Sequence, residues 1–301
     1  PDTESAQEAL RQGSADGLAG LNTISNGYNQ SRFVKYDMAL PQYTAIFYNP
    51  TSGPLKNRAV RQALSVALQR QQLITRVFGG AVNPANSPFV TQDMKLQTGI
   101  STYEPDRAKN LMANAGYTKN DQGQLVDKEG KQFTLTLSVV EDDEQLQVAS
   151  ELEQQWSNEL GLTVAIVPVP SYRLADIIAS HSYDAILATE VVGLDPDPYP
   201  YWHSSQTANG RNLALFQNRA ADQLMVLARN TTDPVERINI YTKLLDIFKE
   251  ENPATFLYSA PFHYLLHQDI KGLTVLVINQ PSDRFTNVNL WYKNTDHKWQ
   301  K

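Results

Sequence analysis

The stretch "FTLTLSVVEDDEQLQVASELEQQWSNELGLTVAIVPV", residues 133–169, decides the fold of this chain. It opens with the alternating apolar and polar residues of a strand at 133–140 and closes with a β-branched run that predicts a second strand at 163–169. Between them, apolar residues recur at helical spacing over 144–160, and Gly161 ends the helix. Strand, helix and strand in this order predict a right-handed crossover between two parallel strands.

The alternation of strands and helices continues toward the carboxyl end. Residues 172–180 have the spacing of a short helix, and "YDAILATEVV", residues 183–192, is typical of a buried strand. The whole series predicts a largely parallel sheet with helices on its faces, which is an α/β layer architecture. A β-rich apolar run predicts a further strand at 43–49. Apolar spacing, N-caps and glycine stops predict helices at 57–78, 106–115, 222–229 and 234–250.

The composition is that of an ordinary globular protein. With 301 residues, 41% hydrophobic and 19% charged, the chain is expected to fold as one large domain or two lobes. The net charge of −6 argues against a general nucleic-acid surface, which needs clustered lysine and arginine. The absence of cysteine excludes disulfides, a thiolate nucleophile and a cysteine-ligated metal. Because the chain begins with Pro1 and not with Met, we expect a processed or truncated product.

A candidate site follows the predicted strand at 183–192, in the stretch "TEVVGLDPDPYPYWHSS", residues 189–205. In open parallel sheets, ligands bind outside the carboxyl ends of the strands. Asp195 and Asp197 each precede a proline, which holds them in extended backbone. A rigidly carried carboxylate suits a cation or an amine. The ordinary alternative is that both aspartates are solvated turn residues above packed aromatics.

An enzyme site and a metal site are alternatives for the same part of the sequence. A glycosidase needs two carboxylates about 5 to 9 Å apart, which Asp195 and Asp197 could provide, but nothing in the sequence makes one an acid and the other a base. A calcium loop needs glycine at its bend, where this stretch has proline. His263 and His267 have a metal-compatible spacing without a third ligand nearby. We therefore expect no metal and no cofactor.

Four stretches stand out by their order and spacing: "YTAIFYNPTSGPLKNRAVRQALSVALQRQQLITRVFGGAVNPANSP", "YEPDRAKNLMANAGY", "TTDPVERINIYTKLLDIFKEENPATFLY" and the tail "RFTNVNLWY". Together they resemble the extracytoplasmic solute-binding proteins of peptide-type and nickel-type ABC transporters, bacterial solute-binding protein family 5. Each is similar to a family motif, and their order and spacing are specific. The resemblance covers almost the whole chain.

The resemblance implies a fold and a division of the chain. The fold is a type II periplasmic-binding-protein-like lobe, with a mainly parallel mixed sheet flanked by helices, plus a remnant of a first lobe. Residues 1–42 would be the end of lobe one with the first hinge crossing, and 43–262 would be lobe two. Residues 263–301 would be the return crossing and a carboxyl-terminal segment that packs with lobe one. The chain would thus be a fragment that lacks most of lobe one.

The resemblance also implies a ligand site. In the family, an extended peptide pairs its backbone with strand edges, and an aspartate holds its free amine. The family pattern places Asp195 at the amine position and Asn212 in a cleft loop. Where many members carry an aromatic before this aspartate, the chain has Val192. Tyr199, Tyr201 and Trp202 could compensate for it, or each could pack in the core. Backbone pairing with the solute would run along Glu190 to Gly193. The ligand-binding residues implied are Asp195, Glu190, Val191, Val192, Gly193, Asn212, Tyr199 and Trp202.

The function implied is that of a non-enzymatic binding protein. Two lobes would close over an oligopeptide or other small solute, and the closed form would dock on an ABC permease. We expect a monomer outside the cytoplasm, in the periplasm or as a cell-surface lipoprotein, without a nucleic-acid partner. Two alternatives stay open: a glycoside hydrolase that uses Asp195 and Asp197, and an isolated lobe that binds nothing.

Overall fold

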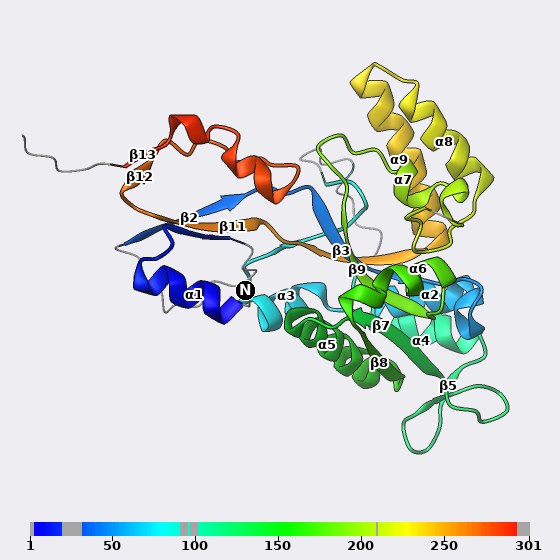
Figure 1. Cartoon of the computed structure of the whole chain (residues 1–301). Coiled ribbons are helices and arrows are strands. Elements are labelled where there is room, and N and C mark those ends of the chain that lie inside the picture. The colour runs from blue at the N-terminus through cyan, green and yellow to red at the C-terminus, as the bar shows by residue number, and fades with distance from the viewer. Residues whose placement is uncertain (1–2, 20–31, 91–95, 97–101, 209, 294–301) are drawn as a thin grey trace, which may run out of the picture. The chain divides into compact units, whose positions relative to one another are not determined.

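The structure, a computed structural model, describes residues 3–19, 32–90, 96, 102–208 and 210–293 (Figure 1). The chain divides into two compact units. Unit 1 combines the two end segments, Pro1–Pro41 and Ala260–Lys301, and unit 2 is the continuous segment Gln42–Ser259. The polypeptide therefore enters unit 2 once and leaves it once.

Unit 2 is built on a six-stranded sheet with the order β4-β10-β3-β9-β7-β8. β7 pairs in parallel with both β8 and β9, and the other three pairings are antiparallel. The predicted mixed α/β sheet flanked by helices is confirmed. The strands are β3 (Gln42–Tyr48), β4 (Asn83–Pro84), β7 (Thr134–Val140), β8 (Thr163–Val169), β9 (Ala185–Val191) and β10 (Ala254–Ser259).

The parallel part of this sheet is limited to β7, β8 and β9, so the expectation of a mainly parallel sheet holds for only half of it. β3 carries the chain into unit 2 and β10 carries it out again, so these neighbouring strands run in opposite directions. β3 is also antiparallel to β9, over seven residue pairs from Gln42↔Val191 to Tyr48↔Ala185. The strands by which the chain enters and leaves unit 2, β3 and β10, therefore make the antiparallel part of the sheet.

The predicted strand, helix and strand stretch is confirmed. Helix α5 (Asp143–Leu160) connects β7 to β8 and packs on both strands. It begins after Asp142, whose carboxylate accepts hydrogen bonds from the backbone N–H groups of Glu144 (3.1 Å) and Gln145 (3.2 Å). It ends at Gly161, whose φ of 72° is a left-handed conformation that favours glycine.

The helix predicted over 57–78 is in fact two helices, α2 (Arg58–Val66) and α3 (Arg70–Phe78). Just before α3, the backbone N–H of Gln69 donates a hydrogen bond of 2.8 Å to the side chain of Gln155 on α5. A side chain from another helix thus satisfies a backbone group at the break. Apolar spacing cannot reveal such a tertiary contact.

Helices cover both faces of the sheet. α2, α3 and α5 pack on one face with α4 (Pro105–Asn114) beside them, and α7 (Tyr199–Trp202) lies on the other face with α8 (Arg219–Arg229) and α9 (Pro234–Glu251). α8 and α9 form a helical hairpin (Figure 1). The core beneath it includes the rings of Tyr43, Phe47, Trp202, Tyr241, Phe248 and Phe256. The smaller elements of unit 2 are α6 (Leu174–Ser180), β5 (Thr118–Lys119), β6 (Leu125–Val126), η1 (Gly53–Lys56), η2 (Ser171–Arg173) and η3 (Ser204–Gln206).

Unit 1 contains a three-stranded antiparallel sheet with the order β1-β11-β2. Its core includes Met38, Phe262, Tyr264, Leu266 and Ile278. The elements of unit 1 are α1 (Thr3–Gln12), β1 (Gly17–Ala19), β2 (Phe33–Met38), β11 (Phe262–His267), β12 (Ile270–Lys271), η4 (Pro281–Phe285), η5 (Val288–Leu290) and β13 (Tyr292–Lys293). In the described part of the chain, no helix has the length and apolar character needed to cross a membrane.

Candidate functional site

The candidate site lies at the carboxyl end of β9, where this strand extends beyond its parallel neighbour. The β7·β9 pairing ends at Val139↔Leu187, whereas the β3·β9 pairing continues to Val191. Among the described residues, no strand pairs with β9 on the β7 side after Leu187. Residues 188–191 therefore present a strand edge at the carboxyl end of the parallel strands, the end at which α/β sheets bind ligands.

A turn follows this edge and carries the first aspartate. Gly193 has a φ of 79°, a left-handed conformation that residues with a Cβ adopt at a cost. Asp195, two residues later, has a side chain that is 64% exposed. Its Oδ1 lies 2.7 Å from Nη2 of Arg237, in the first turn of α9, and Arg237 Nε also donates to the hydroxyl of Tyr241 (3.0 Å). Asp195 is thus accessible to solvent, with one carboxylate oxygen held by an arginine.

Asp197 is held more completely. The Nε and Nη2 atoms of Arg229, on α8, both donate to its Oδ2, at 2.8 and 2.6 Å. Its Oδ1 accepts a hydrogen bond from the backbone N–H of Tyr199 (3.1 Å), and the Arg229 guanidinium lies 3.9 Å from the centre of the Tyr199 ring. Both carboxylate oxygens therefore stabilise the loop, and the two aspartates pair with arginines of different helices.

The aromatic residues of the loop differ in their positions. Tyr199 is partly buried and stacks on His203, with ring centres 4.1 Å apart. Trp202 is 0% exposed, and its ring packs against Phe248 and donates through Nε1 to the hydroxyl of Tyr43 (3.2 Å). The expectation that Trp202 contacts a ligand does not fit this burial, because a ligand would have to displace the core to reach it.

Asn212 is buried too, and its amide is used inside the protein. Its Nδ2 donates to the backbone carbonyls of Trp202 (3.2 Å), His203 (3.2 Å) and Phe216 (2.9 Å), and its Oδ1 accepts from the N–H of Phe216 (3.0 Å). With its hydrogen-bonding groups occupied by backbone, Asn212 fixes the loop after α7. A ligand contact by this side chain, as expected from the sequence, does not fit these bonds.

Glu190 points from β9 into the apolar core and is 2% exposed. Its Oε2 lies 3.0 Å from Nη2 of Arg211, although this oxygen accepts no well-aligned hydrogen bond. Burial raises the pKa of Glu190 to about 7, against the opposing charge of Arg211. The expected contribution of Glu190 and Val191 was through their backbone, so the buried carboxylate is a finding of the structure.

Sequence reasoning missed Arg211. Its guanidinium lies over the ring of Tyr201 at 5.0 Å, and the Tyr201 hydroxyl donates to the carbonyl of Val191 (2.6 Å), so one aromatic ring connects Arg211 to the strand edge. Val192, next along the chain, is partly buried against the core. A signal did exist: a charged residue on the apolar face of a predicted strand, such as Glu190, requires a buried or nearby cation.

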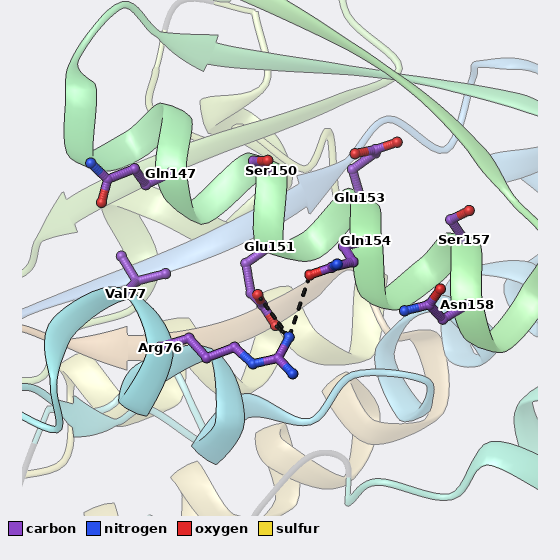
Figure 2. A pocket seen from close by; sticks show the side chains of 9 residues that line it. All are labelled: Arg76, Val77, Gln147, Ser150, Glu151, Glu153, Gln154, Ser157 and Asn158. Carbon is purple, nitrogen blue, oxygen red and sulfur yellow. Dashed lines mark hydrogen bonds and ion pairs between the residues drawn. The ribbon is translucent and has the colours of Figure 1, made fainter.

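A separate hollow of about 500 Å³ lies between α3 and α5 (Figure 2). Its lining is mostly polar, and Arg76 reaches across it to Glu151 (3.1 Å) and Gln154 (3.4 Å). Glu151 also accepts from Gln155 (2.8 Å), so Arg76 and Glu151 are paired with each other in the hollow. Among the described residues, no group of three or more acidic or histidine side chains could hold a metal ion.

Comparison with known proteins identifies a family. Residues 1–212 match the model of the bacterial extracellular solute-binding proteins, family 5 Middle. The oligopeptide-binding protein AppA of Bacillus subtilis is 26% identical over 262 residues, which is 85% of this chain and 47% of AppA. The dipeptide-binding protein of Pseudomonas aeruginosa is 25% identical over 241 residues, 76% of this chain and 42% of that protein. The chain thus spans about half the length of these relatives.

Solved structures show the same fold. NikZ from Campylobacter jejuni, in complex with Ni(L-His), matches 97% of this chain and 60% of its own, with a TM-score of 0.83 at 23% identity. AppA from Bacillus subtilis, in complex with a nonapeptide, matches 98% of this chain and 60% of its own, with a TM-score of 0.80 at 24% identity. The type II periplasmic-binding-protein fold expected from the sequence is confirmed.

Proposed function

This chain belongs to the bacterial extracellular solute-binding proteins of family 5, and we propose that it serves an ABC importer by binding a peptide-like solute and presenting it to the permease. The protein acts as a binder and not as an enzyme. It works outside the cytoplasm, in the periplasm or as a cell-surface lipoprotein. In this proposal, unit 2 is the ligand-binding lobe and unit 1 is part of a first lobe that a longer protein completes.

The strand edge at residues 188–191 is the observation that carries this proposal. β9 continues past the end of its pairing with β7, and no described strand takes its place. An extended peptide can add itself to such an edge through main-chain hydrogen bonds, which gives affinity that tolerates different side chains. We place the backbone of the solute along Glu190 to Gly193.

Asp195 is proposed to bind the free amine of the solute. Its side chain is 64% exposed, and its ion pair with Arg237 engages Oδ1. An ammonium group approaching Oδ2 would form a charge-assisted hydrogen bond, which contributes about 1.5 to 3 kcal/mol. Because Arg237 holds Oδ1, the ammonium group would share the carboxylate with this arginine.

Calorimetry on the intact protein tests the proposal, with tripeptides that carry a free or an acetylated amino terminus. We expect Asp195→Asn to weaken binding of the free-amine peptides about 10-fold or more, in line with the bond energy above. Asp197→Asn is the matched control, because it lies in the same loop, also precedes a proline and also pairs with an arginine. Equal affinities for Asp195→Asn and the unchanged protein would remove Asp195 from the site.

The hydrolase alternative has less support than binding. Asp197 is engaged through both oxygens by Arg229 and the N–H of Tyr199. Two carboxylates that act on one glycosidic bond must both face it, whereas these two pair with arginines of separate helices. Turnover of chromogenic glycosides that either Asp→Asn change abolishes would reverse this assignment.

Delivery to the permease rests on closure of two lobes around the solute. The chain passes between units 1 and 2 at Pro41–Gln42 and at Ser259–Ala260, and we place the hinge at these two crossings. Small-angle scattering of the intact protein should show a smaller radius of gyration when a bound tripeptide is present. A radius that does not change on saturation would contradict closure.

A further inference from the structure

The ion pair between Glu190 and Arg211 joins a buried group to an accessible one. Glu190 is 2% exposed, whereas the side chain of Arg211 is 59% exposed. A ligand can therefore reach the guanidinium directly, whereas the carboxylate is covered while the ion pair is intact. A solute anion can meet Arg211 directly, while a solute cation could meet Glu190 only after Arg211 had moved away.

Arg211 also lies beside the strand edge that is proposed to hold the solute. Its guanidinium lies 5.0 Å from the centre of the Tyr201 ring, and the same tyrosine donates its hydroxyl to the carbonyl of Val191. If a solute pairs with β9 at Val191, only the ring of Tyr201 separates the guanidinium of Arg211 from the strand edge that it occupies. Arginine suits a carboxylate in this position because its planar guanidinium can donate two parallel hydrogen bonds.

Glu190 is paired with Arg211 by charge, but without a hydrogen bond. Glu190 Oε2 lies 3.0 Å from Nη2 of Arg211, but the geometry does not make a hydrogen bond, and this oxygen is otherwise buried. A buried carboxylate without full hydrogen bonding is costly in its charged form. Taking up a proton removes that cost, and it also leaves Arg211 without an anionic partner.

We propose that Arg211 binds a carboxylate of the solute, and that Glu190 releases Arg211 by taking up a proton from solvent as the solute enters. The proposal rests on the function proposed above and adds a second charged contact to it. Arg211 exchanges one carboxylate for another. Glu190 remains in the core, protonated and neutral, because two carboxylates on one guanidinium would repel each other.

The groups around Glu190 fit this exchange near neutral pH. The ionisable groups that face it in the described structure are the hydroxyls of Tyr43 from β3 and Tyr201 from α7, together with Arg211. Burial raises the pKa of both tyrosines, so both stay neutral. Burial also raises the pKa of Glu190 to about 7, so this carboxyl group changes charge within the physiological range.

Thermal shift and calorimetry on the intact protein, with four mixed tripeptide libraries, test the proposal. Two libraries have free or amidated carboxyl termini, and the other two repeat this pair with Asp and Glu replaced by Asn and Gln. The second pair separates a terminal from a side-chain carboxylate. The carboxylate form should bind about tenfold more weakly at pH 8 than at pH 6, because Glu190 must first be protonated. Calorimetry in buffers of different ionisation enthalpy should show proton uptake at pH 7.

Three variants separate the roles of the two residues. Glu190→Gln should keep binding but lose the pH dependence and the proton uptake. Arg211→Gln should remove the preference for carboxylates over amides, and Arg211→Lys should restore part of it. Arg219→Gln, at an exposed position on α8, is the matched control and should behave as the unchanged protein.

Each outcome decides the question. If tripeptides bind, but acid and amide bind equally and Arg211→Gln changes nothing, this inference fails and the proposed function stands. If Glu190→Gln abolishes binding and Arg211→Gln strengthens it for cationic peptides, Glu190 is a cation site and the inference is overturned. If no library binds at either pH, the proposed function fails and the inference fails with it.

Discussion

The carboxylate of Asp195 lies 2.7 Å from the guanidinium of Arg237, so the proposed amine-binding group already has a cation beside it. Arg237 comes from the first turn of α9, and Asp195 from the loop after β9. A solute ammonium must therefore share this carboxylate with Arg237 or replace it. The affinity for free amines then depends on α9 as well as on the loop.

Replacement of Arg237 tests this competition. Arg237→Gln should tighten binding of free-amine tripeptides by up to about fivefold, because an exposed ion pair contributes at most about 1 kcal/mol. Acetylated tripeptides, which lack the ammonium, should bind as before. Calorimetry measures both. Weaker binding of the free-amine peptides would mean that Arg237 positions the loop and does not compete with the solute.

The backbone of Gly193 sets the path of the loop. With its φ of 79°, Gly193→Ala should cost about 1 to 2 kcal/mol of unfolding free energy, measured in urea. Tripeptide binding should weaken as well, because Asp195 follows two residues later. Gly80→Ala is the matched control, because Gly80 has a φ of 85° and open space where the methyl group of alanine would lie. It should lose similar stability and keep its affinity, and a loss of affinity in both variants would contradict a local effect.

Trp202 is expected to act on stability. It is 0% exposed and packs against Phe248, so Trp202→Ala should cost about 3 to 5 kcal/mol of unfolding free energy. Tyr172→Ala, at a side chain that is 83% exposed, should stay within about 0.5 kcal/mol. Urea denaturation compares the two. A loss below about 1 kcal/mol for Trp202→Ala would mean that the ring is not part of the core.

Asn212 gives a prediction that depends on hydrogen-bond direction. Asn212→Ala should cost about 1 to 3 kcal/mol, because buried carbonyls lose their donor. Asn212→Asp keeps the shape but should cost more at neutral pH, because a carboxylate would face the carbonyls of Trp202, His203 and Phe216. Urea denaturation at pH 7 ranks the variants. An Asp variant as stable as the unchanged protein would contradict the donor role.

Glu190 predicts a pH dependence of folding. Its pKa is raised from 4.5 to about 7 by burial, so the folded protein binds more protons than the unfolded chain between these two values. The free energy of unfolding should therefore fall as pH rises through this window and level off above it. Between pH 5 and pH 8 the loss amounts to about 2 to 3 kcal/mol. The free energy of unfolding of Glu190→Gln, measured in urea relative to the unchanged protein, should therefore rise by that amount between pH 5 and pH 8. A difference in unfolding free energy between the two proteins that stays constant across pH would contradict a raised pKa.

The parts of the fold that local sequence determines were predicted well. β7, α5 and β8 follow from alternation, helical spacing and the Gly161 stop, all of which act within a few residues. The break before α3 was missed because it depends on Gln155, far along the chain. The sheet was predicted as mixed, but its antiparallel part was underestimated because strand direction depends on where the chain enters and leaves unit 2.

In the candidate site, too, local features were predicted from the sequence and tertiary contacts were not. Proline after Asp195 and Asp197 predicted a stiff loop behind a strand, which is where the structure places them. The arginine partners of both aspartates lie on helices that only folding brings near. Asn212 was a candidate ligand residue through the family motif, and Trp202 through its place near Val192, because neither shows in the sequence how deeply the side chain is buried. Burial is decided by the packing of α8 and α9 over the sheet.

The entry and exit strands of unit 2 have a consequence for protein engineering. Thr44 and Tyr258 are direct partners in the antiparallel β3·β10 pairing, with Cα atoms about 5 Å apart, and lie close to the two ends of Gln42–Ser259. A continuous segment with adjoining ends can be cut out and grafted into a surface turn of an unrelated host without a long linker. Unit 2 is therefore a suitable segment for domain insertion.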